Sequence, residues 1–159
     1  MSSAQPTIPP DDPKRSLTLA QLENLPHIGL VGDTHTITVT GEQTAGRFCV
    51  IDMHIPPGGG PPPHRHFEET FIVLEGQMEA TFRGQNSAVR AGETLNIPAN
   101  APYQFHNASV EAVRTLCICS PAGQEKFFTG EILFGGWSSR RHSYHASAQA
   151  LGKGSCGFH

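Results

Sequence analysis

The middle of the chain is a succession of short segments in which polar and apolar residues alternate or apolar residues run together. The segment "THTITVTG" (residues 34–41) alternates, and "GEQTAGRFCVIDMHI" (41–55) has the pattern of a turn followed by a strand. Six more segments follow: "TFIVLEG", "QMEATFRG", "NSAVRAG", "TLNIPAN", "YQFHN" and "EAVRTLCICS". Short strands punctuated by Gly and Pro at spacings of roughly 8–12 residues predict an all-β sandwich or barrel.

The two ends of the chain differ from this pattern. The segment "SLTLAQLENLPH" (residues 16–27) predicts a short helix, with Ser16 as its N-cap and Pro26 as its stop. Residues 128–159 are rich in Gly, Ser and His and have little periodicity, which predicts an irregular, loosely packed tail. The expected organisation is a flexible N-terminal arm over residues 1–33, a barrel over 34–127 and the tail over 128–159.

Composition and charge narrow the class of protein. The 159 residues are enough for one domain with a single core, and 17 Gly and 13 Pro suit short strands and turns. The net charge of -3 without a basic block argues against nucleic-acid binding. No apolar run reaches the roughly 18 residues that span a bilayer, so no membrane partner is expected. The polar, Pro-rich N-terminus lacks the apolar core of a secretory signal, which predicts a cytoplasmic location.

The four cysteines do not form a paired CxxC zinc pattern. Cys117 and Cys119 are two residues apart in "RTLCICS", so in a strand they share a face. Buried small apolar side chains are the favoured interpretation of these cysteines, with metal ligation as the alternative. A disulfide framework is not expected at this size and in this compartment.

The segment "GGGPPPHRHFEETFIVLEG" (residues 58–76) carries the densest chemistry. On one strand His64 and His66 would point the same way, and a carboxylate just beyond a bend can supply a third donor. Two neutral imidazoles and one carboxylate form the facial set that holds mononuclear iron and related ions and leaves positions open for substrate or oxygen. The alternative is a solvated polar loop. The Gly/Pro-rich approach and the apolar strand that follows favour the metal site.

Two segments resemble the two motifs of the cupin superfamily, in order and at a cupin-like separation. The first resembles G-x5-H-x-H-x3,4-E-x6-G, and "GETLNIPANAPYQFHN" (92–107) resembles G-x5-P-x-G-x2-H-x3-N. The matching residues are Gly58, His64, His66, a glutamate and Gly76 in the first motif, and Gly92, Pro98 and Asn107 in the second. The resemblance covers residues 35–120. Within the superfamily, the chain resembles quercetinase-like single-domain cupins.

The resemblance implies a small double-stranded β-barrel of the jelly-roll type with a metal near the barrel mouth. It implies that His64, His66 and the glutamate hold one divalent transition metal: Fe, Mn, Ni or Zn. Cupins are often dimers, and exposed edge strands favour pairing, so a homodimer is expected.

The first departure from the family concerns the carboxylate. Only two residues separate His66 from Glu69, where the family has three or four. Glu69 is the favoured ligand because it keeps the six-residue spacing to Gly76 and shares the strand parity of Phe71 and Val73. Glu68 is the alternative, since it continues the parity of the two histidines if the strand does not bend.

The second departure concerns the family's fourth ligand, a histidine, whose position is taken by Tyr103. Asn100 correspondingly takes the place of the motif's second glycine. A phenol has a pKa near 10 and ligates only when a metal lowers it. Tyr103 is therefore a candidate metal ligand, a hydrogen-bonding partner of the substrate or a packing residue. His106 would reach the site only through a bulge, because in a regular strand it faces away from Tyr103.

The remaining candidates have weaker signals. His54 precedes the first motif, and a surface position is favoured over the pocket mouth. His27 and His35 have no partner that the sequence identifies. Met78, Ala80 and Phe82 alternate on one strand, which predicts barrel core.

The predicted function is a mononuclear metal-dependent enzyme that acts on a small organic molecule in the barrel. Glu69 and Tyr103 are the candidate catalytic residues. The resemblance to quercetinase-like cupins favours a dioxygenase, and a metal-dependent isomerase or lyase is an alternative. A non-catalytic metal- or ligand-binding cupin is another alternative, as is a metal-free isomerase in which His64 or Tyr103 moves a proton.

Overall fold

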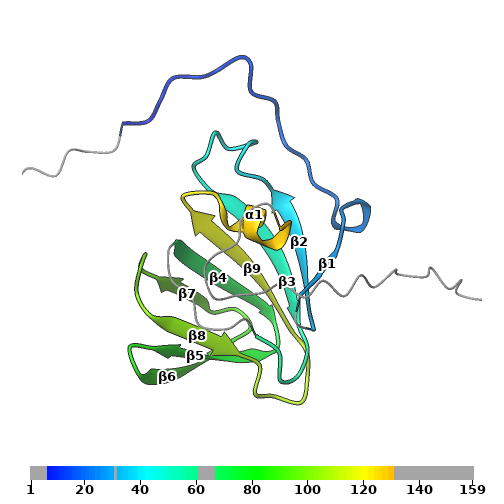
Figure 1. Ribbon diagram of the computed structural model, residues 1–159, viewed down its shortest axis with the longest axis vertical. Coiled ribbons are helices and arrows are strands. Elements are labelled where there is room, and N and C mark those ends of the chain that lie inside the picture. The colour runs from blue at the N-terminus through cyan, green and yellow to red at the C-terminus, as the bar shows by residue number, and fades with distance from the viewer. Residues whose placement is uncertain (1–6, 31, 61–66, 131–159) are drawn as a thin grey trace, which may run out of the picture.

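The computed structural model describes residues 7–30, 32–60 and 67–130, and their strands form two antiparallel sheets (Figure 1). The larger sheet has the order β1-β2-β3-β9-β4-β7, and the smaller has the order β6-β5-β8. The elements are β1 (Ile28–Leu30), β2 (Asp33–Val39), β3 (Cys49–Ile55), β4 (Glu68–Glu75), β5 (Gln77–Phe82), β6 (Gln85–Arg90), β7 (Thr94–Ile97), β8 (Tyr103–His106), β9 (Val113–Ser120) and the helix α1 (Gln124–Phe128). No helix among the described residues is long and apolar enough to cross a bilayer.

The predicted all-β, jelly-roll type of fold is confirmed. Each strand-like segment of the sequence corresponds to one strand from β2 to β9. In β9 buried and half-buried side chains alternate, as the period of two in a half-buried strand requires. The sequence did not indicate β1 or α1, because elements of 3 and 5 residues are too short to show a period.

The core lies between the two sheets, and aromatic side chains connect them. Phe71 of β4 meets Phe105 of β8 edge to face, with ring centroids 4.8 Å apart, and both side chains are at most 1% exposed. Met78 and Ala80 of β5 are buried and Phe82 packs against the same core, as their alternation predicted. Full burial of one large apolar side chain contributes about 1.5–3 kcal/mol, so these contacts strongly favour the face-to-face packing of β4 and β8.

Asn107, directly after β8, ties the two motif segments together. Its buried Nδ2 group donates to the carbonyl oxygens of Ile55 (3.0 Å) and Glu111 (2.6 Å). Its main-chain oxygen accepts from the N–H of Gly58 (2.7 Å), and its own N–H donates to the oxygen of Gly59 (2.8 Å). The turn after β3 is therefore fixed to the end of β8, and this turn precedes the two histidines in the sequence.

The backbone at Asn100 agrees with its place as the substitute for a motif glycine. Its φ of 62° lies in the left-handed region, which asparagine enters more readily than most other residues. The motif glycines Gly58, Gly76 and Gly92 also have positive φ values, of 77°, 80° and 89°. The turn of the second motif is thus kept although its second glycine is replaced by Asn100.

The helix expected over residues 16–27 is wrong in extent. Only Leu22–Asn24 form a helical turn, of the 3-10 type, and no side chain caps it. Leu17 and Leu19 are 95% and 84% exposed, so no buried apolar face stabilises a longer helix. Pro26 disfavours helical geometry at the preceding residue, Leu25, which is extended.

Glu125 of α1 joins the helix to the turn between β2 and β3. Its Oε1 accepts from the N–H of Gly41 (2.7 Å) and its Oε2 from the N–H of Gly123 (2.8 Å). A Cβ at residue 41 would lie 2.5 Å from Oε1 and 2.6 Å from the Cβ of Ala122, so this close approach favours glycine there. Burial alone would raise the pKa of Glu125, but a hydrogen bond from Cys49 and the main-chain N–H groups hold this pKa below its ordinary value.

We predict that Glu125→Gln lowers the free energy of unfolding by about 1–3 kcal/mol at neutral pH, because an amide nitrogen replaces one buried acceptor. A carboxylate whose folded-state pKa is lowered stabilises the fold above the pKa of an unfolded glutamate, and this contribution is lost as the pH falls. The difference from the native protein should therefore shrink in acid. Urea unfolding at about pH 7 and pH 4 measures the difference in free energy of unfolding between the variant and the native protein. Glu42→Gln, in the same turn, is the exposed control. Equal losses at both pH values would contradict the assigned role.

Candidate metal centre

The structure places two of the four predicted metal ligands. His64 and His66 lie outside the described residues. Glu69 is the second residue of β4, and Tyr103 is the first residue of β8. These two residues therefore come from the two opposing sheets, one from each.

The two candidate glutamates face opposite sides of β4. Glu69 is 1% exposed and shares the buried face with Phe71 and Val73, whereas Glu68 is exposed. This placement agrees with the strand parity that favoured Glu69. Metal binding by Glu69 stays a prediction. Glu68 is exposed on the outer face, so it could ligate a metal inside the barrel only if the register of β4 shifted.

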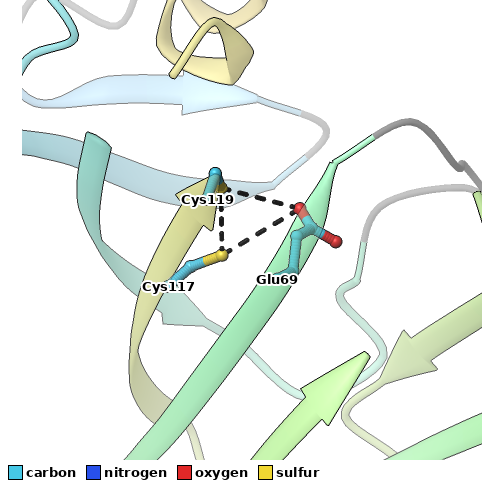
Figure 2. A group of neighbouring side chains, drawn as sticks. All are labelled: Glu69, Cys117 and Cys119. Carbon is cyan, nitrogen blue, oxygen red and sulfur yellow. Dashed lines mark hydrogen bonds between the residues drawn. The ribbon is translucent and has the colours of Figure 1, made fainter. Parts of the chain in front are cut away.

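Two thiols from the neighbouring strand contact the Glu69 carboxylate. Cys119 lies directly opposite Glu69 in the β4–β9 ladder, and its Sγ is 3.8 Å from Glu69 Oε1. The Sγ of Cys117 is 4.0 Å from the same oxygen and 3.5 Å from the Sγ of Cys119. Figure 2 shows this triangle, with the second carboxylate oxygen of Glu69 pointing away from the sulfurs.

The contact between Glu69 and the thiols was missed from the sequence. The interpretation of Cys117 and Cys119 as buried side chains on one face is correct, since both are 0% exposed. The spacing of these cysteines within β9 could be read from the sequence, but the identity of the adjacent strand and its register could not. Only the pairing of Cys119 with Glu69 brings the sulfurs to the carboxylate.

The surroundings raise the pKa values of both thiols. Burial raises the pKa of Cys117, and the hydrogen bond with Cys117 together with burial raises the pKa of Cys119 far above its ordinary value. Cys49 is the direct neighbour of Cys119 on the other side, in β3. The Sγ of Cys119 donates to Oε1 of Gln124 at 2.6 Å. Two thiols with raised pKa values therefore contact one oxygen of Glu69 on the inner face of the larger sheet.

Tyr103 lies in the interior opposite β4. It is 4% exposed, and its ring is tilted against Phe71 and stacked with Phe105, with centroids 6.4 Å apart in both pairs. Phe71 is two residues from Glu69 on the same buried face of β4. The phenol of Tyr103 is therefore part of the aromatic wall of the interior that Glu69 also faces.

Three other histidines can be placed relative to this interior. His106 is 45% exposed and its Nε2 lies 3.5 Å from Oε2 of Glu79, which is opposite it in β5, so the regular strand turns it outward. His54 is exposed, as favoured from the sequence. His35, for which the sequence gave no partner, is 1% exposed, with Nε2 3.9 Å from Asp33 Oδ2 and its ring edge-on to Phe128.

The donor atoms around Glu69 have the chemistry of a transition-metal site. Glu69, Cys117 and Cys119 each offer one atom, and these atoms lie within 4.8 Å of one another. Carboxylate oxygen and sulfur together suit zinc and iron, whereas magnesium and calcium prefer oxygen alone. The residues present therefore fit a mononuclear transition metal on the inner face of β4.

Comparisons with known proteins give the family context of this geometry. Residues 51–119 match the cupin domain family. Over 79 residues the chain is 35% identical to quercetin 2,3-dioxygenase of Bacillus subtilis (strain 168), an overlap of 48% of this chain and 23% of that protein. The chain thus spans less than a quarter of the length of that curated relative.

Solved structures give the same fold. The polyketide cyclase RemF from Streptomyces resistomycificus is 25% identical, with a TM-score of 0.58 over 66% of this chain and 80% of that chain. A predicted oxalate decarboxylase from Thermotoga maritima is 15% identical, with a TM-score of 0.59 over 65% of this chain and 98% of that chain. The likeness to the oxalate decarboxylase concerns the fold alone.

Glu69→Gln should weaken metal binding far more than Glu68→Gln, by at least about tenfold, because only Glu69 lies on the buried face. The two variants remove the same charge from adjacent positions, so Glu68→Gln is the matched control. Competition with a chromogenic chelator measures the affinity. A larger loss in Glu68→Gln would mean that the metal-bound strand is shifted by one residue.

Tyr103→His should tighten metal binding roughly tenfold or more if residue 103 occupies the position of the family's fourth ligand, because an imidazole replaces a weak donor. Tyr103→Phe keeps the ring contacts with Phe71 and Phe105 and removes only the hydroxyl, which makes it the control. The same chelator competition on the three proteins is the measurement. Unchanged affinity in Tyr103→His would show that residue 103 does not reach the metal.

Proposed function

We propose that this chain, which belongs to the cupin superfamily, is a mononuclear metal-dependent enzyme acting on a small organic molecule in the barrel. The observation that carries the proposal is the placement of Glu69. Its carboxylate is 1% exposed on the inner face of β4, three residues after the second histidine of the H-x-H segment. A carboxylate in an apolar interior is costly unless a proton or cation compensates it.

The metal would be held by His64, His66 and Glu69, with Tyr103 as a candidate fourth ligand. A divalent transition metal bound there supplies a Lewis acid with positions open for substrate or oxygen. The hydrogen bonds of Asn107 support this assignment, because they hold the turn that precedes the histidines against the end of β8.

The chain's own residues would bind and orient the substrate. Phe71, Phe105 and Met78 are buried and apolar. Beside the metal they would exclude water and favour a flat or hydrophobic molecule. The Tyr103 phenol would donate a hydrogen bond to a substrate oxygen from the wall opposite Glu69. Proton transfer would then fall to Glu69 or Tyr103, the titratable groups on the inner faces of the two facing strands.

The favoured reaction is an oxygen-dependent oxidation, supported by the 35% identity to quercetin 2,3-dioxygenase. The likeness to the polyketide cyclase RemF favours an alternative in which the metal polarises an oxygenated substrate without oxidation, as in an isomerase or lyase. Tyr103 in place of a histidine favours a third function, a metal- or ligand-binding protein without turnover. We also propose that the protein is a homodimer and that it is cytoplasmic. Light scattering, which measures the molecular mass in solution, tests the dimer.

The native protein should bind about one divalent transition metal per chain, and His64→Ala/His66→Ala should lose it while β-rich circular dichroism is kept. The metal-loaded native protein should consume oxygen with a flavonol such as quercetin, and the double variant should not. Elemental analysis and an oxygen electrode are the measurements. Exposed His54→Ala is the matched control for loss of a histidine.

Three outcomes separate the alternatives. Metal uptake without oxygen consumption, but with conversion of a polyketide-like substrate, would favour the isomerase or lyase. Metal uptake with ligand binding and no turnover would favour the binding protein. Unchanged metal content in the double histidine variant would contradict the proposed ligands.

A further inference from the structure

We propose that Cys117 and Cys119 are sulfur ligands of the metal ion held by Glu69. The inference rests on the proposed function, since it concerns the ion held by Glu69. In a tetrahedral shell with the carboxylate and two sulfurs, one of His64 and His66 would be the fourth ligand, and substrate would enter as a fifth. The inference goes beyond that function because neither sequence motif contains these cysteines. It also narrows the metal to one that accepts thiolate.

The triangle of donor atoms has nearly the size that a tetrahedral ion requires. With metal–sulfur distances of about 2.3 Å and a metal–oxygen distance of about 2.0 Å, tetrahedral angles separate two sulfurs by about 3.8 Å and sulfur from oxygen by about 3.5 Å. The observed separations are 3.5 Å between the sulfurs and 3.8 and 4.0 Å from sulfur to Glu69 Oε1. Each differs by roughly half an ångström or less, which small side-chain rotations can supply.

The three donors stand on rigid, adjacent backbone. Glu69 and Cys119 are direct partners in the β4–β9 ladder, and Cys117 pairs with Phe71 one step further along the same face. All three side chains are 0–1% exposed. Few rotamers need to be ordered when an ion binds, so the entropic cost of assembling the site is small.

The buried surroundings suit metal-bound thiolates. A coordinating thiol loses its proton outright, so two thiolates and one carboxylate would face the ion. Gln124, whose Oε1 accepts from Cys119 in the protein as it stands, can turn its amide so that the NH₂ group donates to a thiolate instead. Such a site selects zinc, cobalt or iron over manganese and magnesium, which prefer oxygen donors.

The experiment uses Co²⁺ as a probe, because sulfur ligation gives an intense sulfur-to-cobalt charge-transfer band in the near ultraviolet. Co²⁺ is titrated into the full chain, native and variant, after removal of bound metal by dialysis. The native protein should show the band, and Cys117→Ala/Cys119→Ala should lose it and bind Co²⁺ at least about tenfold more weakly. Cys49→Ala removes a buried thiol on the next strand and should keep the band.

X-ray absorption of the native protein loaded with Zn²⁺ gives a second readout that needs no variant. The inference expects sulfur scatterers at about 2.3 Å from zinc. This measurement stands even where the double cysteine variant fails to fold, because only the native chain is used.

The outcomes distinguish this inference from the proposed function. Co²⁺ bound without the charge-transfer band and lost in His64→Ala/His66→Ala would overturn sulfur ligation and leave the histidine site intact. A band kept in that histidine variant but lost in the cysteine variant would support sulfur ligation and overturn the histidine ligands. Zinc without sulfur neighbours would overturn the inference, and absence of any metal binding would overturn both.

Discussion

Burial of the Glu69 carboxylate is the constraint on which the rest of the site depends. The side chain is 1% exposed on a face it shares with Phe71 and Val73, where an ionised group needs a proton, donors or a cation nearby. The adjacent strand supplies two thiols at 3.8 and 4.0 Å, and the facing sheet supplies an aromatic wall. The fold thus brings a carboxylate and two thiols together beside the apolar core, an arrangement typical of a functional site rather than of core packing.

The two sheets and the loops between them hold this point in place from several directions. Pairing of β4 with β9 sets which sulfurs meet the carboxylate, and Phe71 against Phe105 sets how β4 faces β8. Asn107 then fixes the turn before the histidines to the end of β8. These are strand pairings, ring packing and the hydrogen bonds of Asn107, so the chemistry at Glu69 can vary while the frame persists. The different reactions named among similar proteins agree with this.

Much of the fold was readable from local patterns, and much of the site was not. Strands β2 to β9 follow from alternation and turn residues. The choice of Glu69 over Glu68 for the buried face follows from the spacing to Gly76 and from parity with Phe71 and Val73. The thiol contacts depend on which strand lies beside β4 and in what register, which no local pattern reveals. The buried placement of His35 likewise depends on α1, whose Phe128 packs against it. The expected helix over residues 16–27 failed because propensity without a buried face does not sustain a helix.

The central claim is that one transition metal binds at the Glu69 carboxylate, and anomalous X-ray diffraction tests it most directly. Crystals of protein purified without chelator would be measured on both sides of the absorption edge of the metal found in the sample. The account predicts a single strong anomalous peak per chain at about 2.0–2.2 Å from a Glu69 oxygen. A peak elsewhere in the chain, or none at Glu69 after soaking with Fe²⁺, Ni²⁺ and Zn²⁺, would contradict it.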